Sequence, residues 1–406
     1  MQQTGLLKRI KIFVNTPRGA SIAMWVAYFI YWAGGAAVLP YISVYYDSIA
    51  LRGSQIGMLN SIPYFITLIS SIVFAFLSDV SRRNKLVLGI CVIGLITALL
   101  LFPTATSFIT LLPIVLMWSL FSAPTNPIMD QTTLVSLEDP GNYGRIRVGG
   151  SIGWAIMVSV TGYLIDNLGF GLPVIFYINA IFLGIFFLFI YFIPSQRRVE
   201  TAPENRASLQ AVRDLLRQPG FLVFLLLLVI WGIGEATIGN FLFLHIKFLG
   251  GSSTLMGTAL SASLIGEITT FSLANRIQRR VGALRMMLAS FLVLFTWLMG
   301  ISLIRDPNII PFFQVFGGAG FALIQSGSVA YVDKRAHKAI GTTAQAIRGG
   351  VMAGLGVGTG SLITGIIYEA AGSVFLFRTM AFFVLGGFFA ALLFYLRDRR
   401  RNGLPS

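Results

Sequence analysis

The sequence of 406 residues contains about twelve apolar stretches, each long enough to cross a bilayer as a helix of about 20 residues, with short connections between them. Hydrophobic residues make up 56% of the chain and charged residues only 11%, which leaves too few polar side chains to cover a water-facing surface. We therefore predict an all-α membrane protein. The predicted spans lie near residues 21–46, 55–78, 85–105, 108–136, 144–166, 172–193, 220–246, 254–276, 283–304, 308–332, 343–368 and 374–396.

The formal net charge of +15 is concentrated at one set of predicted loop positions. Lys and Arg cluster in the N-terminal tail, in alternate loops and in the C-terminal tail, whereas the loops 103–107 and 167–171 contain none. By the positive-inside rule, both termini are predicted to be cytoplasmic, which requires an even number of spans in the cell (inner or plasma) membrane. A basic chain can also indicate nucleic-acid binding, but no nucleic-acid-binding fold is compatible with this pattern, so we expect no such partner.

The polar segment 195–219 is the one long cytoplasmic connection, and it divides the chain into two predicted six-helix bundles, 1–194 and 220–406. The halves resemble each other: the charged hinge 77–83 returns as 273–280. Two pairs of residues, Arg145 with Arg348 and Asp166 with Glu369, share one sequence offset. Repeated halves of six spans are typical of secondary transporters, whose site lies between the halves near the middle of the membrane.

The polar residues offer no enzyme chemistry. There is no Cys/His spacing for a metal, no glycine loop for phosphate and no nucleophile elbow in a suitable context. The single cysteine, Cys91, cannot form a disulfide within the chain. We expect no enzymatic activity, no cofactor and no metal.

Several motifs show that the chain resembles the major facilitator superfamily over essentially its whole length. The hinge with Asp79, Arg82 and Arg83 is similar to the superfamily's loop between spans two and three, although Ala75 and Arg82 stand where glycines are usual. The strings 28–31, 127–130 and 143–154 resemble the branch that includes lactose permease, phenylpropionate permease and nucleoside:proton symporters. Members of that branch are proton-coupled uptake systems, so the resemblance implies symport.

The resemblance also implies roles for single residues. Asp130 and Arg147 match the acid and the arginine that contact sugar in lactose permease, and Trp154 matches its stacking tryptophan. Glu267 matches an acid shared across the group. Gln325 occupies the position of the family's span-ten histidine, and no Glu follows three residues later, so the detailed proton path of lactose permease is not expected here.

Charges inside a bilayer cost at least roughly 2.5 kcal/mol each, so they persist where they are paired, solvated or used. Asp130 and Arg147 are predicted to face each other on neighbouring helices, either as a pair that opens for solute hydroxyls or carboxylates, or as a permanent salt bridge. Glu267 and Glu235 are predicted proton carriers. The alternative is that these carboxyl groups stay protonated and only hold helices together.

Aromatic side chains and the cytoplasmic rim complete the candidate site. Tyr28 and Tyr31 are predicted to line the cavity and to stack on a solute, although most aromatic residues of such a chain only pack. A further set is predicted to form the inner gate, where basic loops are expected for topology alone: Asp79, Arg82, Arg83, Arg145 and Arg348.

We therefore expect a monomeric secondary transporter that moves a small organic solute with protons by alternating access. The preferred solutes are a sugar or glycoside, then a nucleoside, then an aromatic carboxylate. A proton-antiport exporter uses the same fold and remains the main alternative. A non-transporting membrane sensor is the second alternative, and the acids predicted inside the spans, Asp130, Glu235 and Glu267, argue against it.

Overall fold

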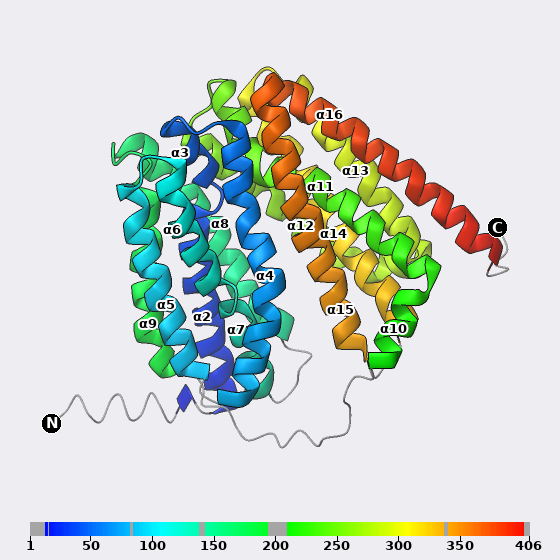
Figure 1. Cartoon of the computed structure of the whole chain (residues 1–406), viewed down its shortest axis with the longest axis horizontal. Coiled ribbons are helices and arrows are strands. Elements are labelled where there is room, and N and C mark those ends of the chain that lie inside the picture. The colour runs from blue at the N-terminus through cyan, green and yellow to red at the C-terminus, as the bar shows by residue number, and fades with distance from the viewer. Residues whose placement is uncertain are drawn as a thin grey trace. The chain divides into compact units, whose positions relative to one another are not determined.

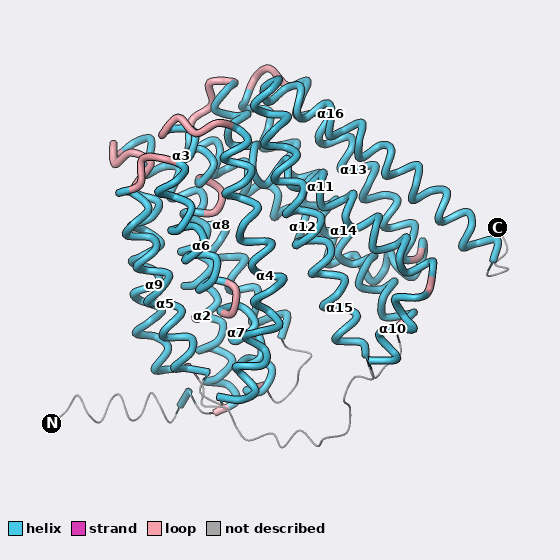
Figure 2. The backbone as a smooth tube through the Cα atoms, viewed as in Figure 1, coloured by secondary structure: helices cyan, strands magenta, loops and turns pink. Residues whose placement is uncertain are grey.

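The computed structural model describes residues 13–14, 16–81, 84–137, 143–193, 209–336 and 340–401. Within these ranges the chain forms helices joined by short loops and contains no strand (Figure 2). Lipid offers no hydrogen-bond partners, so a spanning segment must satisfy its backbone N–H and C=O groups internally, as a helix does. Contacts between residues divide the chain into two units, 1–51 with 66–201 and 52–65 with 202–406.

The first unit contains most of the helices that precede the central connection (Figure 1). Helix α8 packs along α2, while α9 packs on both α2 and α5. The helices are α2 (Pro17–Val38), α3 (Ile42–Ser48), the greater part of α4 (Gly53–Ser81), α5 (Asn84–Leu101), α6 (Phe108–Ser122), α7 (Thr125–Ser136), α8 (Tyr143–Asn167) and α9 (Val174–Phe189).

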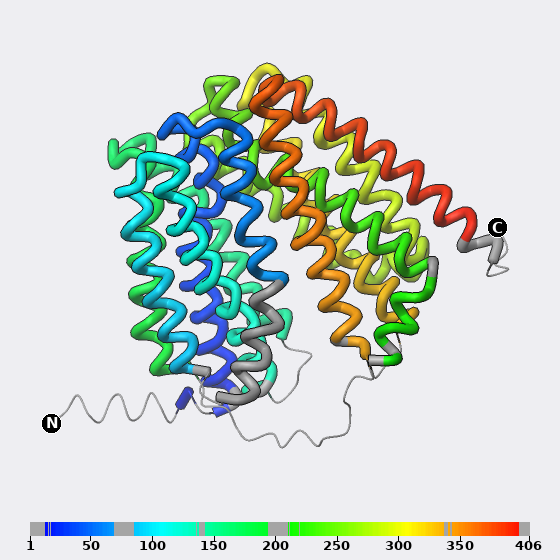
Figure 3. Tube along the Cα trace, viewed as in Figure 1, coloured from blue at the N-terminus to red at the C-terminus, as the bar shows by residue number. Residues whose placement is uncertain are grey.

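The second unit contains the beginning of α4 and the helices after the connection. The helices after the connection run from green to red in Figure 3. Helix α14 packs on α12 and α13, and α16 packs on α11 and α13. The helices are α10 (Leu209–Arg217), α11 (Pro219–Phe248), α12 (Ser253–Val281), α13 (Ala283–Leu303), α14 (Ile310–Arg335), α15 (Gly341–Gly350), a π-helical segment (Val351–Val357) and α16 (Gly358–Arg401).

Local sequence signals explain where several helices begin and break. The Thr16 side chain accepts a hydrogen bond from the Gly19 N–H and so caps α2, with proline in its first turn. Ser107 and Thr110 form a capping box at the start of α6. Gly372 interrupts α16 with a φ of 75°, a conformation that glycine adopts without steric cost.

The twelve spans predicted from hydropathy are confirmed. Nine stretches of the described chain are long and apolar enough to cross a membrane. The last of them, Thr343–Arg397, contains the break at Gly372 and therefore holds two predicted spans, while α4 and α12 occupy the two that remain. The chain is thus an all-α, multi-pass membrane protein.

Two elements were not expected. Helix α10 lies inside the segment predicted as a linker. The eleventh span contains the π-helical segment Val351–Val357, which includes the buried residues Gly354 and Gly356. A Cβ atom at Gly232 of α11 would lie 2.5 Å from the carbonyl oxygen of Met352, so the π-helical segment and α11 are in backbone contact there.

Candidate functional site

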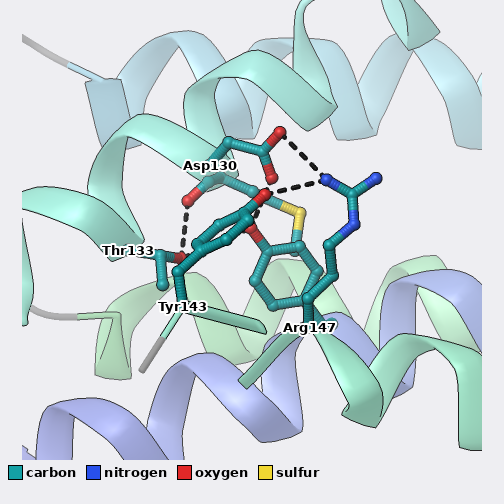
Figure 4. A network of polar contacts seen from close by, with 6 residues as sticks. Asp130, Thr133, Tyr143 and Arg147 are labelled. Carbon is teal, nitrogen blue, oxygen red and sulfur yellow. Dashed lines mark hydrogen bonds and ion pairs between the residues drawn. The ribbon is translucent and has the colours of Figure 1, made fainter. Parts of the chain in front are cut away.

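The first unit contains a polar network that joins three helices (Figure 4). Arg147 of α8 donates from Nη1 to Asp130 Oδ2 of α7 at 3.4 Å and to the Tyr143 hydroxyl at 2.8 Å. Tyr28 of α2 donates its hydroxyl proton to Asp130 Oδ1 at 2.5 Å. The Thr133 hydroxyl donates to the Tyr28 oxygen at 3.4 Å. Asp130 therefore binds a guanidinium through one oxygen and a phenol through the other.

The network depends on a close approach of α8 to α2. A Cβ atom at Gly149 would lie 2.5 Å from the backbone oxygen of Trp25, and one at Gly153 would lie 2.5 Å from that of Phe29. No side chain fits in these positions, so glycines set the spacing of the two helices. This spacing holds Tyr28 and Arg147 on adjacent helices that both reach Asp130.

Exposure differs sharply within the network. Tyr28 is completely buried, whereas the side chains of Arg147 and Asp130 are 48% and 31% exposed. A charge pair that retains this much access can exchange its partners for those of a bound molecule at lower cost than a fully enclosed pair. Its chemistry suits hydroxyl groups, because a carboxylate accepts and a guanidinium donates.

Two of the predicted aromatic residues also lie in the first unit, in ring clusters. Trp154 meets Trp32 edge-on with 5.8 Å between ring centroids. Tyr31 lies against Trp32 at 5.8 Å and against Phe186 at 5.6 Å. These contacts join Tyr31 and Trp154 through Trp32, and all three residues are of intermediate burial.

The predicted proton carriers belong to the second unit. Glu235 lies at the middle of α11 and Glu267 at the middle of α12, and the two carboxyl groups are close enough to interact electrostatically. Glu235 Oε2 is buried and has no hydrogen-bond partner among the described residues, and neither has Trp231 Nε1 one turn earlier. Trp231 packs on Phe321 of α14 with a centroid separation of 6.3 Å.

Gln325 and Arg348, which we assigned to different parts of the transporter, are in direct contact. Arg348 Nη1 donates to Gln325 Oε1 at 2.9 Å. Arg348 is half-buried in the second unit and lies about two turns inside α15, the helix that begins at Gly341. Its role in the inner gate stays a prediction.

The structure describes fewer contacts for the remaining gate candidates. Arg145 is exposed in the first turn of α8. Arg82 and Arg83 lie outside the described residues, as does the side chain of Asp79. Their role in gating stays a prediction.

Two residues of the network were not singled out from the sequence. Tyr143 precedes Arg147 by four positions and Thr133 follows Asp130 by three, so each lies one helical turn from a predicted site residue. A search for polar side chains at these spacings around every charge inside a span would have found both.

Comparison with known proteins places this architecture in a family. Residues 21–379 match the model of the MFS_1 like family. The chain belongs to this family. As a member of the MFS_1 like family it is a transporter of the major facilitator superfamily and not an enzyme, as the sequence motifs predicted.

Relatives match this family member over most of its length. Maltose permease of Geobacillus stearothermophilus is 27% identical over 383 residues, 92% of this chain and 94% of the relative. The probable 3-phenylpropionic acid transporter of Escherichia coli (strain K12) is 25% identical over 358 residues, 86% of this chain and 92% of the relative.

A solved structure shows the same fold. The nucleoside transporter NupG superimposes with a TM-score of 0.80, covering 93% of this chain and 99% of that one. The sequences are 18% identical, so this likeness concerns the fold alone.

Proposed function

We propose that this MFS_1 like protein imports a small organic solute together with protons by alternating access. It would act as a monomer in the bacterial inner membrane with both termini in the cytoplasm. The preferred solutes are a sugar or glycoside, then a nucleoside, then an aromatic carboxylate. The observation that carries the proposal is the network of Tyr28, Asp130, Tyr143 and Arg147 on three helices of the first unit.

The network is suited to a polyhydroxylated solute. Sugar hydroxyls both donate and accept hydrogen bonds, so Asp130 can receive one hydroxyl proton while Arg147 donates to a neighbouring oxygen. Trp154 offers an apolar ring face to the sugar or base. The name of one similar protein, a maltose permease, agrees with a sugar or glycoside as the first choice.

Proton coupling is assigned to Glu267, with Glu235 as the second candidate. A carboxyl group inside a span persists only where it is paired, solvated or used, and Glu235 has an unpartnered oxygen in the described structure. Such a group can take up a proton while its surroundings are wet and release it after the transporter changes state.

The test is uptake into proteoliposomes that are loaded at pH 8 and placed in buffer at pH 6. A panel of radiolabelled glycosides, nucleosides and aromatic acids is supplied outside. Wild-type protein should accumulate one class of solute above its external concentration. Glu267→Gln should abolish this accumulation but retain exchange between labelled and unlabelled solute at equal pH, because exchange needs no net proton transfer. Asp214→Asn, which removes an exposed carboxylate on α10, serves as the matched control.

Each other outcome contradicts a defined part of the proposal. Solute that leaves the vesicles when protons enter would identify a proton-antiport exporter. Binding without flux for every solute would favour a sensor. If Asp130→Asn transports the solute as wild type does, the site lies elsewhere in the protein.

A further inference from the structure

Arg348 is a charged side chain inside a span that is held only by neutral oxygens. Its Nε donates to Gln345 Oε1 at 2.9 Å, and its Nη1 donates to Gln325 Oε1 at 2.9 Å and to Ser328 Oγ at 3.0 Å. Within the described part of the chain, no Asp or Glu oxygen lies within 4.0 Å of this guanidinium. Its positive charge is therefore solvated by dipoles but not neutralised.

One nitrogen of this guanidinium, Nη2, is left to donate to a ligand. Arginine carries five N–H groups, and the three on Nε and Nη1 match the three acceptor oxygens. Nη2 makes no hydrogen bond to the described residues, and it is not among the buried polar atoms that lack a partner. Nη2 therefore keeps some accessible surface, and no hydrogen bond to the described residues has to break before it donates to a ligand.

The side chains around Arg348 fix its orientation. Gln325 and Ser328 are three residues apart on one face of α14, and both bind the same Nη1 atom. The amide of Gln345 donates to the Val329 carbonyl oxygen at 3.0 Å, so its own oxygen is held toward Nε. The π-helical segment that follows three residues later is in backbone contact with α11. The orientation of the guanidinium is therefore fixed before a solute binds.

The alternative is that Arg348 only joins α14 to α15 by hydrogen bonds, and this alternative accounts less well for the residues around it. A contact between helices through an arginine is strongest when the arginine meets a carboxylate, as Arg147 does with Asp130. Glutamines at 325 and 345 make the same hydrogen bonds but leave the charge uncompensated. A positive charge without a neighbouring carboxylate is costly inside a span, so the presence of Arg348 there indicates a functional role.

We propose that Arg348 binds the carboxylate of an anionic solute, with Gln325, Gln345 and Ser328 as positioning residues. This rests on the proposed function, because it assigns a solute class to that transport activity. An aromatic carboxylate or a glycoside that carries a carboxylate, such as a glucuronide, fits this chemistry, and the guanidinium supplies the charge-assisted hydrogen bond that a neutral analogue cannot receive.

The test uses matched pairs of probes that differ in the carboxylate alone. The first pair is 3-phenylpropionate with 3-phenylpropanol, and the second is methyl glucuronide with methyl glucoside. Binding to purified full-length protein is measured by calorimetric titration for wild type, Arg348→Gln and Arg348→Lys. Arg285→Gln is the control, since this exposed arginine of α13 binds only the Tyr395 hydroxyl and ring among the described residues.

In wild type, the acid of at least one pair should bind about tenfold or more tightly than its neutral partner. Arg348→Gln should remove that preference, and Arg348→Lys should retain part of it because the charge stays while the planar fork is lost. Arg285→Gln should bind as wild type. If Arg348→Gln does not fold, a reduced but not abolished preference in Arg348→Lys is the supporting result, and an unchanged preference overturns the inference.

Three results separate the inference from the proposed function. Equal affinity for acid and neutral partner in wild type, or an unchanged preference in both Arg348 variants, overturns the inference while transport of a neutral solute stands. Failure of both acids to bind overturns it as well. Binding that depends on Arg348 but occurs without any flux in proteoliposomes supports the anion site and overturns the proposed function.

Discussion

Arg147 and Arg348 lie in corresponding parts of the two units, on the helices that form the fifth and eleventh spans, yet their surroundings differ. Arg147 meets the Asp130 carboxylate at 3.4 Å and the Tyr143 hydroxyl. Arg348 meets two amide oxygens and a hydroxyl. Glu235 and Glu267 of the second unit lie on other helices and do not form an ion pair with it.

This difference separates two ways of keeping an arginine in a membrane. In the first unit the charge is compensated within the protein, so a solute must compete with Asp130 for the guanidinium. In the second unit the charge of Arg348 is only solvated, which leaves it for an incoming anion, and neither Glu235 nor Glu267 is its ion-pair partner. The residue type alone does not set the role, because the charge of the neighbouring oxygens decides it.

Asp130→Asn should produce the largest effect, because it gives Arg147 surroundings as neutral as those of Arg348. The pair is partly exposed, so we expect the free energy of solute binding to weaken by about 2 kcal/mol, between the values for surface and buried pairs. Solute affinity should fall about 30-fold. The measurement is titration of the solute identified in the uptake screen, with Asp214→Asn as the control. An affinity within a factor of about two of wild type would mean that the pair only joins α7 to α8 and does not bind the solute.

Tyr28→Phe should have a smaller effect, because it removes one hydrogen bond and keeps the charge pair. Tyr28 is completely buried and its hydroxyl donates to Asp130 Oδ1, and a hydrogen bond to a charged group contributes about 1.5 kcal/mol. We expect roughly a tenfold loss of solute affinity. Tyr395→Phe in α16, which removes a hydroxyl that accepts from Arg285, is the matched control. If both variants behave alike, Tyr28 does not orient the carboxylate for the solute.

These two networks also show how far the sequence alone could lead. Hydropathy predicts the spans because a bilayer demands apolar length, and the motif around Arg147 predicts its meeting with Asp130. Arg348 was compared with Arg145 because the two share a sequence offset, but Arg145 is exposed whereas Arg348 is half-buried. Its contact with Gln325 joins two helices and depends on their rotation, and the π-helical segment beside it has no clear signal in the sequence.

Gln325→Glu is the opposite change to Asp130→Asn, because it supplies Arg348 with a carboxylate in place of an amide oxygen at 2.9 Å. The side chains have nearly the same shape, so packing should be retained. A half-buried pair formed this way should stabilise the protein against unfolding by about 1 kcal/mol. The carboxylate then competes with an anionic solute, and affinity for the preferred acid should fall about fivefold.

The measurement combines thermal unfolding with titration of the acid, and Gln210→Glu on the exposed side of α10 controls for the added negative charge. Higher stability together with weaker acid binding would show that the neutral surroundings of Arg348 favour solute binding at the expense of stability. Higher stability with unchanged binding of the acid would show that Arg348 only joins α14 to α15, and the two arginines would then differ in strength but not in role.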